Sequence, residues 1–171
     1  SATIGDENYI EAKRLTGDIE NTKVLLDRTK KETEAKFKYF FNSTAELSLD
    51  LLKDLYKETC SHKVLIFPNS RGRTEEVAVK LRKISDKLNG HKFYYSHHSS
   101  VDKEIRESIE HFAKNNERFN FCISCTSTLE LGIDIGTVDK IVQIDSTHSV
   151  ASLVQRVGRS GRKKGEKSIV N

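Results

Sequence analysis

The sequence predicts an α/β protein with a mostly parallel sheet that helices cover on both faces. Short apolar runs, such as VLIF at residues 64–67 and FCI at 121–123, alternate along the chain with amphipathic helical patterns. Strands and helices that alternate in this way form a parallel sheet with crossover helices on its two faces. Polar and glycine-containing loops follow several of these strands, at the edge where such sheets bind ligands.

The first part of the chain has a weaker pattern. Residues 7–16 predict a short helix closed by Gly17, because glycine readily adopts the conformation that ends a helix. Residues 22–41 are charged and extended, with a short strand candidate at 24–26. We interpret this stretch as a connector rather than as part of a core.

From Asn42 onward the pattern is regular. Ser43 and Glu46 form a capping box (Ser-x-x-Glu) ahead of an apolar helical stripe. Three apolar stripes predict helices: Leu47, Leu51 and Leu55; Val77, Leu81, Ile84 and Leu88; and Val101, Ile105, Ile109 and Phe112. The second of these helices is expected to end at Asn89-Gly90, and a further short helix is predicted at 150–157. Strands are predicted at 64–67, 93–95, 120–125, 141–144 and 168–170.

The positive charge is concentrated in one segment. The net charge of the 171 residues is +4, but residues 155–168 alone carry +5 and the remainder carries −1. A nearly neutral domain with one basic segment indicates a local anionic partner.

Composition excludes several classes of protein. The longest apolar run has about four residues, against the ~20 that a membrane helix needs, and the first residues do not resemble a signal peptide. Three cysteines do not indicate a disulfide framework, so a reducing, cytoplasmic location is expected. Cys122 and Cys125 form a lone CxxC on a predicted strand, where they face opposite sides and are expected to pack in the core. No Met occurs, even at position 1, which suggests a fragment or a processed chain.

The basic segment QRVGRSGRKKG has two interpretations. Arg156, Arg159 and Arg162 stand three residues apart, and the glycines between them favour a turn in which guanidinium groups converge on one phosphate. Alternatively, the segment is a solvated basic loop or a general nucleic-acid patch. The overlapping GRKKGEKS is not a Walker A loop, because its glycine spacing is wrong and Glu166 separates Gly165 from Lys167. The sequence contains no other Walker A loop and no DEAD or DExH box.

The segment TSTLELGIDIG follows the strand predicted at 120–125. Thr126 lies at the strand end with a hydroxyl and an amide available to phosphate, and Gly132 permits close approach of the backbone. Asp134 lies between two isoleucines expected in the core. Its carboxylate can accept a ribose hydroxyl or simply cap a turn.

Two further loops are polar. In SHHSS the adjacent histidines point in different directions, so no shared metal site is expected, and Ser99 or Ser100 is expected to cap the next helix with some phosphate contact. In PNSRGR, Ser70 and Arg71 are polar groups at the same sheet edge. A tight turn with a solvated arginine is the simpler interpretation of that loop.

Together and in this order, these segments resemble the second RecA-like lobe of superfamily two helicases. VLIFPNSR resembles motif IV, YYSHHSS motif IVa, CTSTLELGIDIG motif V and QRVGRSGR motif VI, over about residues 43–171. Gln155 at the start of motif VI and Leu-Glu-Leu-Gly in motif V favour a DExH-type enzyme, most like the large helicase-related (Lhr-like) helicases. The opening Ser-Ala-Thr is similar to motif III.

The resemblance implies a RecA-like three-layer domain at 42–171, truncated at its C-terminus, and a tail of the first lobe plus the connector at 1–41. It also implies the role of individual residues. Catalytic contacts to the ATP γ-phosphate are expected from Arg159 and Arg162, with Arg162 as the finger. ATP-binding contacts are expected from Gln155, Gly132 and Asp134, and nucleic-acid contacts from Thr126 and, more weakly, Ser70, Arg71 and His98.

The resemblance further implies the motor lobe of an ATP-dependent helicase that grips single-stranded DNA or RNA. ATP and Mg²⁺ are the expected cofactors, and the first RecA-like lobe of the same protein, which holds Mg²⁺, is an expected partner. The fragment alone is expected to be inactive, and no metal site or membrane contact is expected within it. The alternatives are a nucleic-acid-binding module or an interaction scaffold with no part in ATP hydrolysis.

Overall fold

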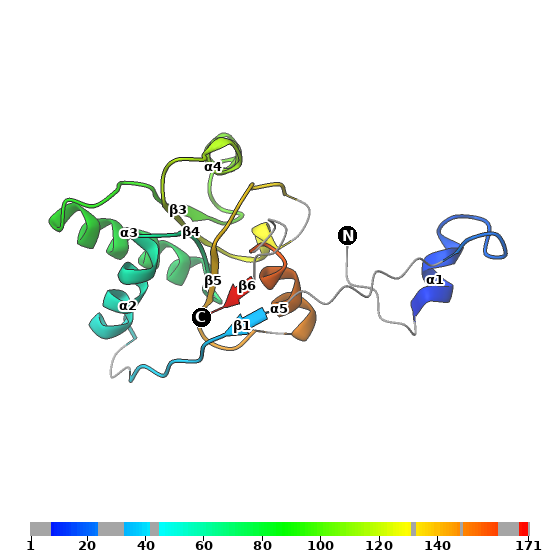
Figure 1. Ribbon diagram of the computed structural model, residues 1–171, viewed down its shortest axis with the longest axis horizontal. Coiled ribbons are helices and arrows are strands. Elements are labelled where there is room, and N and C mark those ends of the chain that lie inside the picture. The colour runs from blue at the N-terminus through cyan, green and yellow to red at the C-terminus, as the bar shows by residue number, and fades with distance from the viewer. Residues whose placement is uncertain are drawn as a thin grey trace.

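The computed structural model describes residues 8–23, 33–41, 45–130, 133–147, 149–160 and 168–170, and these contain a six-stranded sheet flanked by helices (Figure 1). The strands are β1 (Thr33–Ala35), β2 (Lys63–Phe67), β3 (Tyr94–His97), β4 (Phe121–Cys125), β5 (Lys140–Gln143) and β6 (Ser168–Val170). The helices are α1 (Tyr9–Arg14), α2 (Leu49–Thr59), α3 (Arg71–Lys87), α4 (Lys103–Asn115) and α5 (Val150–Val157), with a 3-10 turn, η2, at Ser127–Leu129.

The described strands pair in parallel in the order β1-β6-β5-β2-β4-β3. β2 lies in the middle, where Leu65 pairs with Ile123 of β4 on one side and with Ile141 of β5 on the other. The chain runs from β2 to β3 and β4 on one side and then crosses to β5 on the other. In an open α/β sheet this reversal of direction creates a ligand crevice at the carboxyl ends of the strands.

Helices cover both faces of this sheet, and the alternation of side chains along β2 shows how. Val64 and Ile66 pack with α2 and α3, whereas Leu65 and Phe67 pack on the other face with α4. All four side chains are fully buried, as expected for a central strand covered on both sides. The predicted fold class is therefore confirmed.

The two cysteines of the CxxC follow the same alternation. Cys122 lies in the core beneath α2 and α3, and Cys125 lies in the core on the opposite face. Both side chains are fully buried, and burial raises the pKa of both thiols. The prediction that they pack in the core is confirmed.

Two predicted helix starts are wrong. The helix predicted from the capping box begins at Leu49, and its N-cap is Ser48, whose hydroxyl accepts the Leu51 amide at 3.3 Å. Ser43 lies outside the described residues, and Glu46 instead pairs with Lys80 at 2.8 Å. The helix after β3 begins at Lys103 with Asp102 as its N-cap, so neither Ser99 nor Ser100 caps it.

The connector contains one element that the sequence did not predict. β1 lies within residues 22–41 and pairs with β6, which places it at the edge of the sheet (Figure 1). The strand candidate at 24–26 lies outside the described residues, as does the Ser-Ala-Thr start. Helix α1 has no buried residue and lies apart from the sheet (Figure 1).

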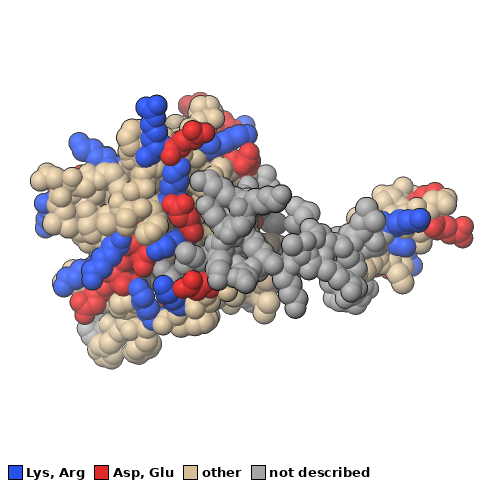
Figure 2. Space-filling model, in the orientation of Figure 1, with Lys and Arg blue, Asp and Glu red and all other residues tan. Residues whose placement is uncertain are grey.

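No helix among the described residues is long and apolar enough to cross a membrane. No group of three or more His, Cys, Asp or Glu side chains in that part of the chain is arranged to hold a metal ion. On the face shown in Figure 2, basic and acidic side chains are intermixed over the body of the domain. That face therefore carries mixed charge rather than one broad positive field.

Candidate nucleotide and nucleic-acid site

The loops at the carboxyl edge of the sheet are joined to one another by hydrogen bonds. The Asn69 amide, after β2, donates to the Ser146 carbonyl, after β5, at 2.7 Å. The Arg71 guanidinium donates to the Ser100 hydroxyl, after β3, at 2.9 Å. These contacts bring the loops after β2, β3 and β5 to one edge, as the parallel topology predicts.

Ser70 and Arg71 lie at the start of a long helix rather than in an isolated turn. Ser70 is the N-cap of α3, and its hydroxyl accepts the Arg73 amide at 3.2 Å. Arg71 is the first residue of the helix, and both side chains are exposed. A helix N-terminus presents unpaired amide groups and the positive end of the helix dipole, so this corner favours an anion.

His98 does not join this exposed corner. Its side chain is buried, its Nε2 lies 2.9 Å from a Glu75 carboxylate oxygen, and its Nδ1 accepts the Ser100 amide at 3.2 Å. Because Nδ1 accepts a hydrogen bond, Nε2 carries the proton and donates to Glu75. The described contacts of His98 thus order the loop after β3 from within.

His97 is a buried neighbour of His98, and the sequence interpretation assigned it no role in the site. It is fully buried, with Nε2 2.8 Å from Glu110 on α4 and Nδ1 2.8 Å from the Thr128 hydroxyl in η2. Burial lowers the pKa of His97. The ring contacts Glu110 through Nε2 and the Thr128 hydroxyl through Nδ1, and this hydroxyl also donates to the His97 carbonyl at 3.2 Å. These contacts together fix η2 against β3. As predicted, the two adjacent histidines point in different directions.

Thr126 lies where predicted, at the end of β4 and before η2. Its backbone amide donates to the His97 carbonyl at 3.2 Å, and its side chain is half-buried. The hydrogen bonds to His97 therefore hold both Thr126 and Thr128 in place.

Asp134 forms the turn that the simpler interpretation anticipates. Its Oδ1 accepts the Gly136 amide at 3.2 Å, and its Oδ2 lies 3.2 Å from the Lys114 ammonium group. The side chain is exposed, whereas Ile135 is buried and Ile133 packs at the edge of the core, as expected. Gly132 lies outside the described residues.

Helix α5 brings the basic segment against the segment after β4. Ser149 is its N-cap, and the helix ends at Val157 before the Gly158 turn that the sequence predicts. Arg159 follows this turn, is only 8% exposed, and donates from Nη1 to the Ile133 carbonyl at 2.8 Å and from Nε to the Glu130 carbonyl at 3.1 Å. Gln155 is half-buried on α5, and Arg162 lies outside the described residues.

Arg156 has a structural environment that spacing alone did not reveal. Its guanidinium donates from Nε to the Glu130 carboxylate at 2.7 Å and from Nη1 to the Gln143 side-chain oxygen. Its central carbon lies 4.8 Å from the centre of the Phe67 ring. Of the three arginines at spacing three, the structure describes two, and both point toward the segment after β4.

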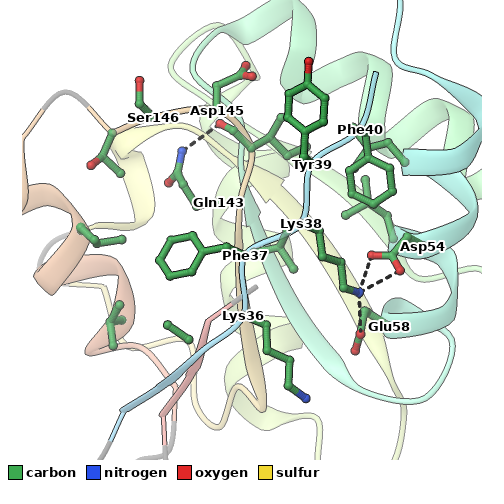
Figure 3. A pocket seen from close by; sticks show the side chains of 18 of the residues that line it. Lys36, Phe37, Lys38, Tyr39, Phe40, Asp54, Glu58, Gln143, Asp145 and Ser146 are labelled. Atoms are coloured by element: carbon green, nitrogen blue, oxygen red, sulfur yellow. Dashed lines mark hydrogen bonds and ion pairs between the residues drawn. The ribbon is translucent and has the colours of Figure 1, made fainter. Parts of the chain in front are cut away.

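A pocket of 640 Å³ lies beside this edge, between the connector, α2, α5 and the end of β5 (Figure 3). Phe37 and Phe40 line it, and Lys38 pairs with Asp54 at 2.8 Å and with Glu58 at 3.9 Å. None of the predicted site residues that the structure describes lines this pocket. The sequence interpretation missed it because its aromatic wall belongs to the stretch interpreted as a connector.

A family model described as the helicase conserved C-terminal domain matches residues 46–164, which contain the sheet edge and the arginines described above. The chain belongs to this helicase C-terminal domain family. The domain is 37% identical to the ATP-dependent helicase Lhr-Core of Methanocaldococcus jannaschii over 98% of the chain and 20% of that protein. It is 38% identical to the Lhr-Core helicase of Saccharolobus solfataricus over 70% of the chain and 14% of that protein. The predicted resemblance to Lhr-like helicases is confirmed.

Solved structures agree with this assignment of the helicase C-terminal domain. Mycobacterium smegmatis helicase Lhr, solved with single-stranded DNA and AMP-PNP, matches 76% of the chain and 17% of its own, with 32% identity and a TM-score of 0.66. The helicase MrfA, solved with DNA and AMPPNP, matches 99% of the chain and 24% of its own, with a TM-score of 0.78 and 22% identity, which supports the fold alone. The chain spans about a fifth of the length of these relatives.

Proposed function

We propose that this domain is the C-terminal motor lobe of an ATP-dependent helicase that moves along single-stranded DNA or RNA. The observation that carries the proposal is the contact between Arg159 and the carbonyl groups of Glu130 and Ile133. It holds the basic turn after α5 beside the glycine-containing segment after β4, at the sheet edge where ligands bind. The similarity to Lhr, which was solved with single-stranded DNA and AMP-PNP, supports binding of a nucleotide and a single strand by a protein that contains this domain.

In this proposal the arginines act on a nucleotide that the first RecA-like lobe supplies. Arg162 has the role of the arginine finger and stabilises charge on the γ-phosphate. Arg159 joins it when nucleotide binds, by exchanging its hydrogen bonds to the Glu130 and Ile133 carbonyls for the phosphate. Gln155, Gly132 and Asp134 border the nucleotide. The first lobe contributes the phosphate-binding loop and the Mg²⁺ ligands, so we expect the domain alone to hydrolyse no ATP.

The nucleic-acid contacts in this proposal come from the other loops of the same edge. Ser70 and Arg71 present a helix N-terminus and an exposed guanidinium group to a phosphate, and Thr126 lies at the end of the neighbouring strand. His98 is buried, so we assign it a supporting role beneath Ser100 in this edge.

The proposal is tested by Arg162→Ala in a full-length protein that contains this chain. We expect ATP turnover to fall by about 10³-fold or more, the lower end of the effect of an arginine finger, while ATP and nucleic acid still bind. Arg118→Ala, at an exposed arginine beyond α4, is the matched control and should leave turnover unchanged. Unchanged turnover in Arg162→Ala with intact strand binding would favour a binding module without a role in hydrolysis.

A further inference from the structure

A chain of side-chain hydrogen bonds runs through the domain from α5 to the loop after β2. Glu130 accepts from Arg156, Arg156 donates to Gln143, and the Gln143 amide donates to Asn69 Oδ1 at 3.4 Å. The Asn69 amide then donates to the Ser146 carbonyl at 2.7 Å. This chain of hydrogen bonds therefore links four parts of the domain: the segment after β4, α5, β5 and the loop that precedes Ser70.

Arg156 determines the direction of every link in this chain. A guanidinium group only donates, so the oxygen of the Gln143 amide must face Arg156 and its nitrogen must face Asn69. The Gln143 nitrogen also donates to the Ile144 carbonyl at 2.9 Å, which agrees with this orientation. Because the Gln143 nitrogen donates, Asn69 presents its oxygen to Gln143 and its nitrogen to Ser146.

Rearranging the buried end of this hydrogen-bond chain would cost much free energy. The side chains of Arg156 and Glu130 are only 5% and 8% exposed, so neither charge can exchange its partner for water. The Phe67 ring, 4.8 Å from the Arg156 guanidinium, holds it from the side of β2. Gln143 lies at the carboxyl end of β5 beside Asp145 and Ser146, where it also lines the pocket (Figure 3).

We propose that Gln143 is a positioning residue that couples the arginine segment of α5 to the loop of Asn69 and Ser70. The proposal rests on the proposed function, in which the first of these segments faces ATP and the second faces the nucleic acid. The buried pair of Glu130 and Arg156 fixes one end of the hydrogen-bond chain, and Gln143 connects that pair to Asn69. In this proposal, a shift of α5 on nucleotide binding moves the Asn69 loop through these hydrogen bonds, which mutation can test.

Gln143→Glu tests this coupling by breaking the chain while keeping the contact with Arg156. The new carboxylate still accepts from Arg156 but has no donor for Asn69. If the Asn69 amide turns to donate to it, Asn69 loses its hydrogen bond to Ser146, so one link fails in either orientation. Asn120→Asp is the matched amide-to-carboxylate control, because Asn120 binds the Cys60 carbonyl at 3.1 Å at the other end of the sheet.

The measurement is ATP turnover of the full-length protein with and without a saturating single-stranded oligonucleotide. We expect Gln143→Glu to lower the stimulation of turnover by nucleic acid at least about fivefold, the lower range of coupling between sites, while Asn120→Asp keeps it. A fall in both rates by the same factor, matched by a lower melting temperature, would indicate a purely structural role and overturn the proposal.

Further outcomes separate this proposal from the proposed function. If the unmodified protein is stimulated by nucleic acid and Gln143→Glu is stimulated equally, the coupling is absent while the motor function stands. If the unmodified protein neither hydrolyses ATP nor responds to nucleic acid, the proposed function fails and the coupling fails with it. Gln143→Met, which removes both donor and acceptor, should lose at least as much stimulation as Gln143→Glu.

Discussion

Arg156 and Glu130 lie 26 residues apart in the sequence, yet the Arg156 Nε donates to the Glu130 carboxylate at 2.7 Å inside the domain. Both side chains are almost completely buried. The same Glu130 residue accepts hydrogen bonds from Arg159 through its backbone carbonyl. Glu130 therefore holds two of the three arginines of the basic segment.

This pair leads to a stability prediction. Glu130→Ala leaves the Arg156 charge buried without its carboxylate, and we expect the free energy of unfolding to fall by about 3–5 kcal/mol. Urea denaturation of the chain measures this change. Glu107→Ala is the control, because Glu107 forms an exposed pair with Lys103 at 3.5 Å, and its loss should cost less than about 1 kcal/mol. Equal effects of the two substitutions would contradict the burial argument.

Gly136 and Gly72 should respond oppositely to alanine. Gly136 has φ +70°, and a Cβ atom there would lie 2.9 Å from the Lys114 carbonyl oxygen, so Gly136→Ala should destabilise the domain by more than about 1 kcal/mol. Gly72 lies in α3, and a Cβ there meets nothing within 4 Å, so Gly72→Ala should stabilise it by about 0.4–1 kcal/mol. Thermal unfolding of both variants measures whether the melting temperature falls or rises. A lower melting temperature for Gly72→Ala would contradict the prediction for Gly72.

His97 should make stability depend on pH. Burial lowers its pKa in the folded state, although Glu110 opposes the shift and Arg106 adds to it. As pH falls below the ordinary histidine pKa of about 6.5, the unfolded chain binds a proton at His97 before the folded chain does. The domain therefore loses stability as pH falls from about 6.5 to the lower pKa of the folded state. We expect the stability difference between the unmodified chain and His97→Gln to shrink as pH falls from 7.5 to about 5.5. Urea unfolding across this range measures it, and parallel curves for the two proteins would refute the prediction.

Arg71 should contribute one phosphate contact to strand binding. In the full-length protein, Arg71→Ala should weaken single-strand binding for all sequences and reduce the slope of log affinity against log salt by about 1. Arg73→Ala is the matched control two residues along the same helix, because Arg73 is occupied by Glu76 at 2.8 Å. Fluorescence anisotropy over a series of salt concentrations distinguishes them. An unchanged slope in Arg71→Ala would remove Arg71 from the interface.

Local patterns were sufficient to predict most elements of the fold. The apolar runs of β2, β4 and β5 and the stripe that gives α3 depend on residues close in sequence, and the structure confirms them. The helix starts were harder, because several polar residues near each start were able to cap it. In the structure the two helices begin at Leu49 and Lys103, so Ser48 and Asp102 occupy the N-cap positions.

The sequence by itself determined the parallel α/β fold, the burial of Cys122 and Cys125, and the family, because periodicity and motif order are properties of the linear chain. Only the tertiary structure decided that Arg156 is buried against Glu130, that His98 faces Glu75, and that β1 joins the sheet. Each of these depends on a partner that is distant in sequence. The sequence around a charged or polar side chain does not show whether that side chain contacts water, a ligand or a buried partner. Only the folded structure brings the distant partner into contact and so determines which of these it is.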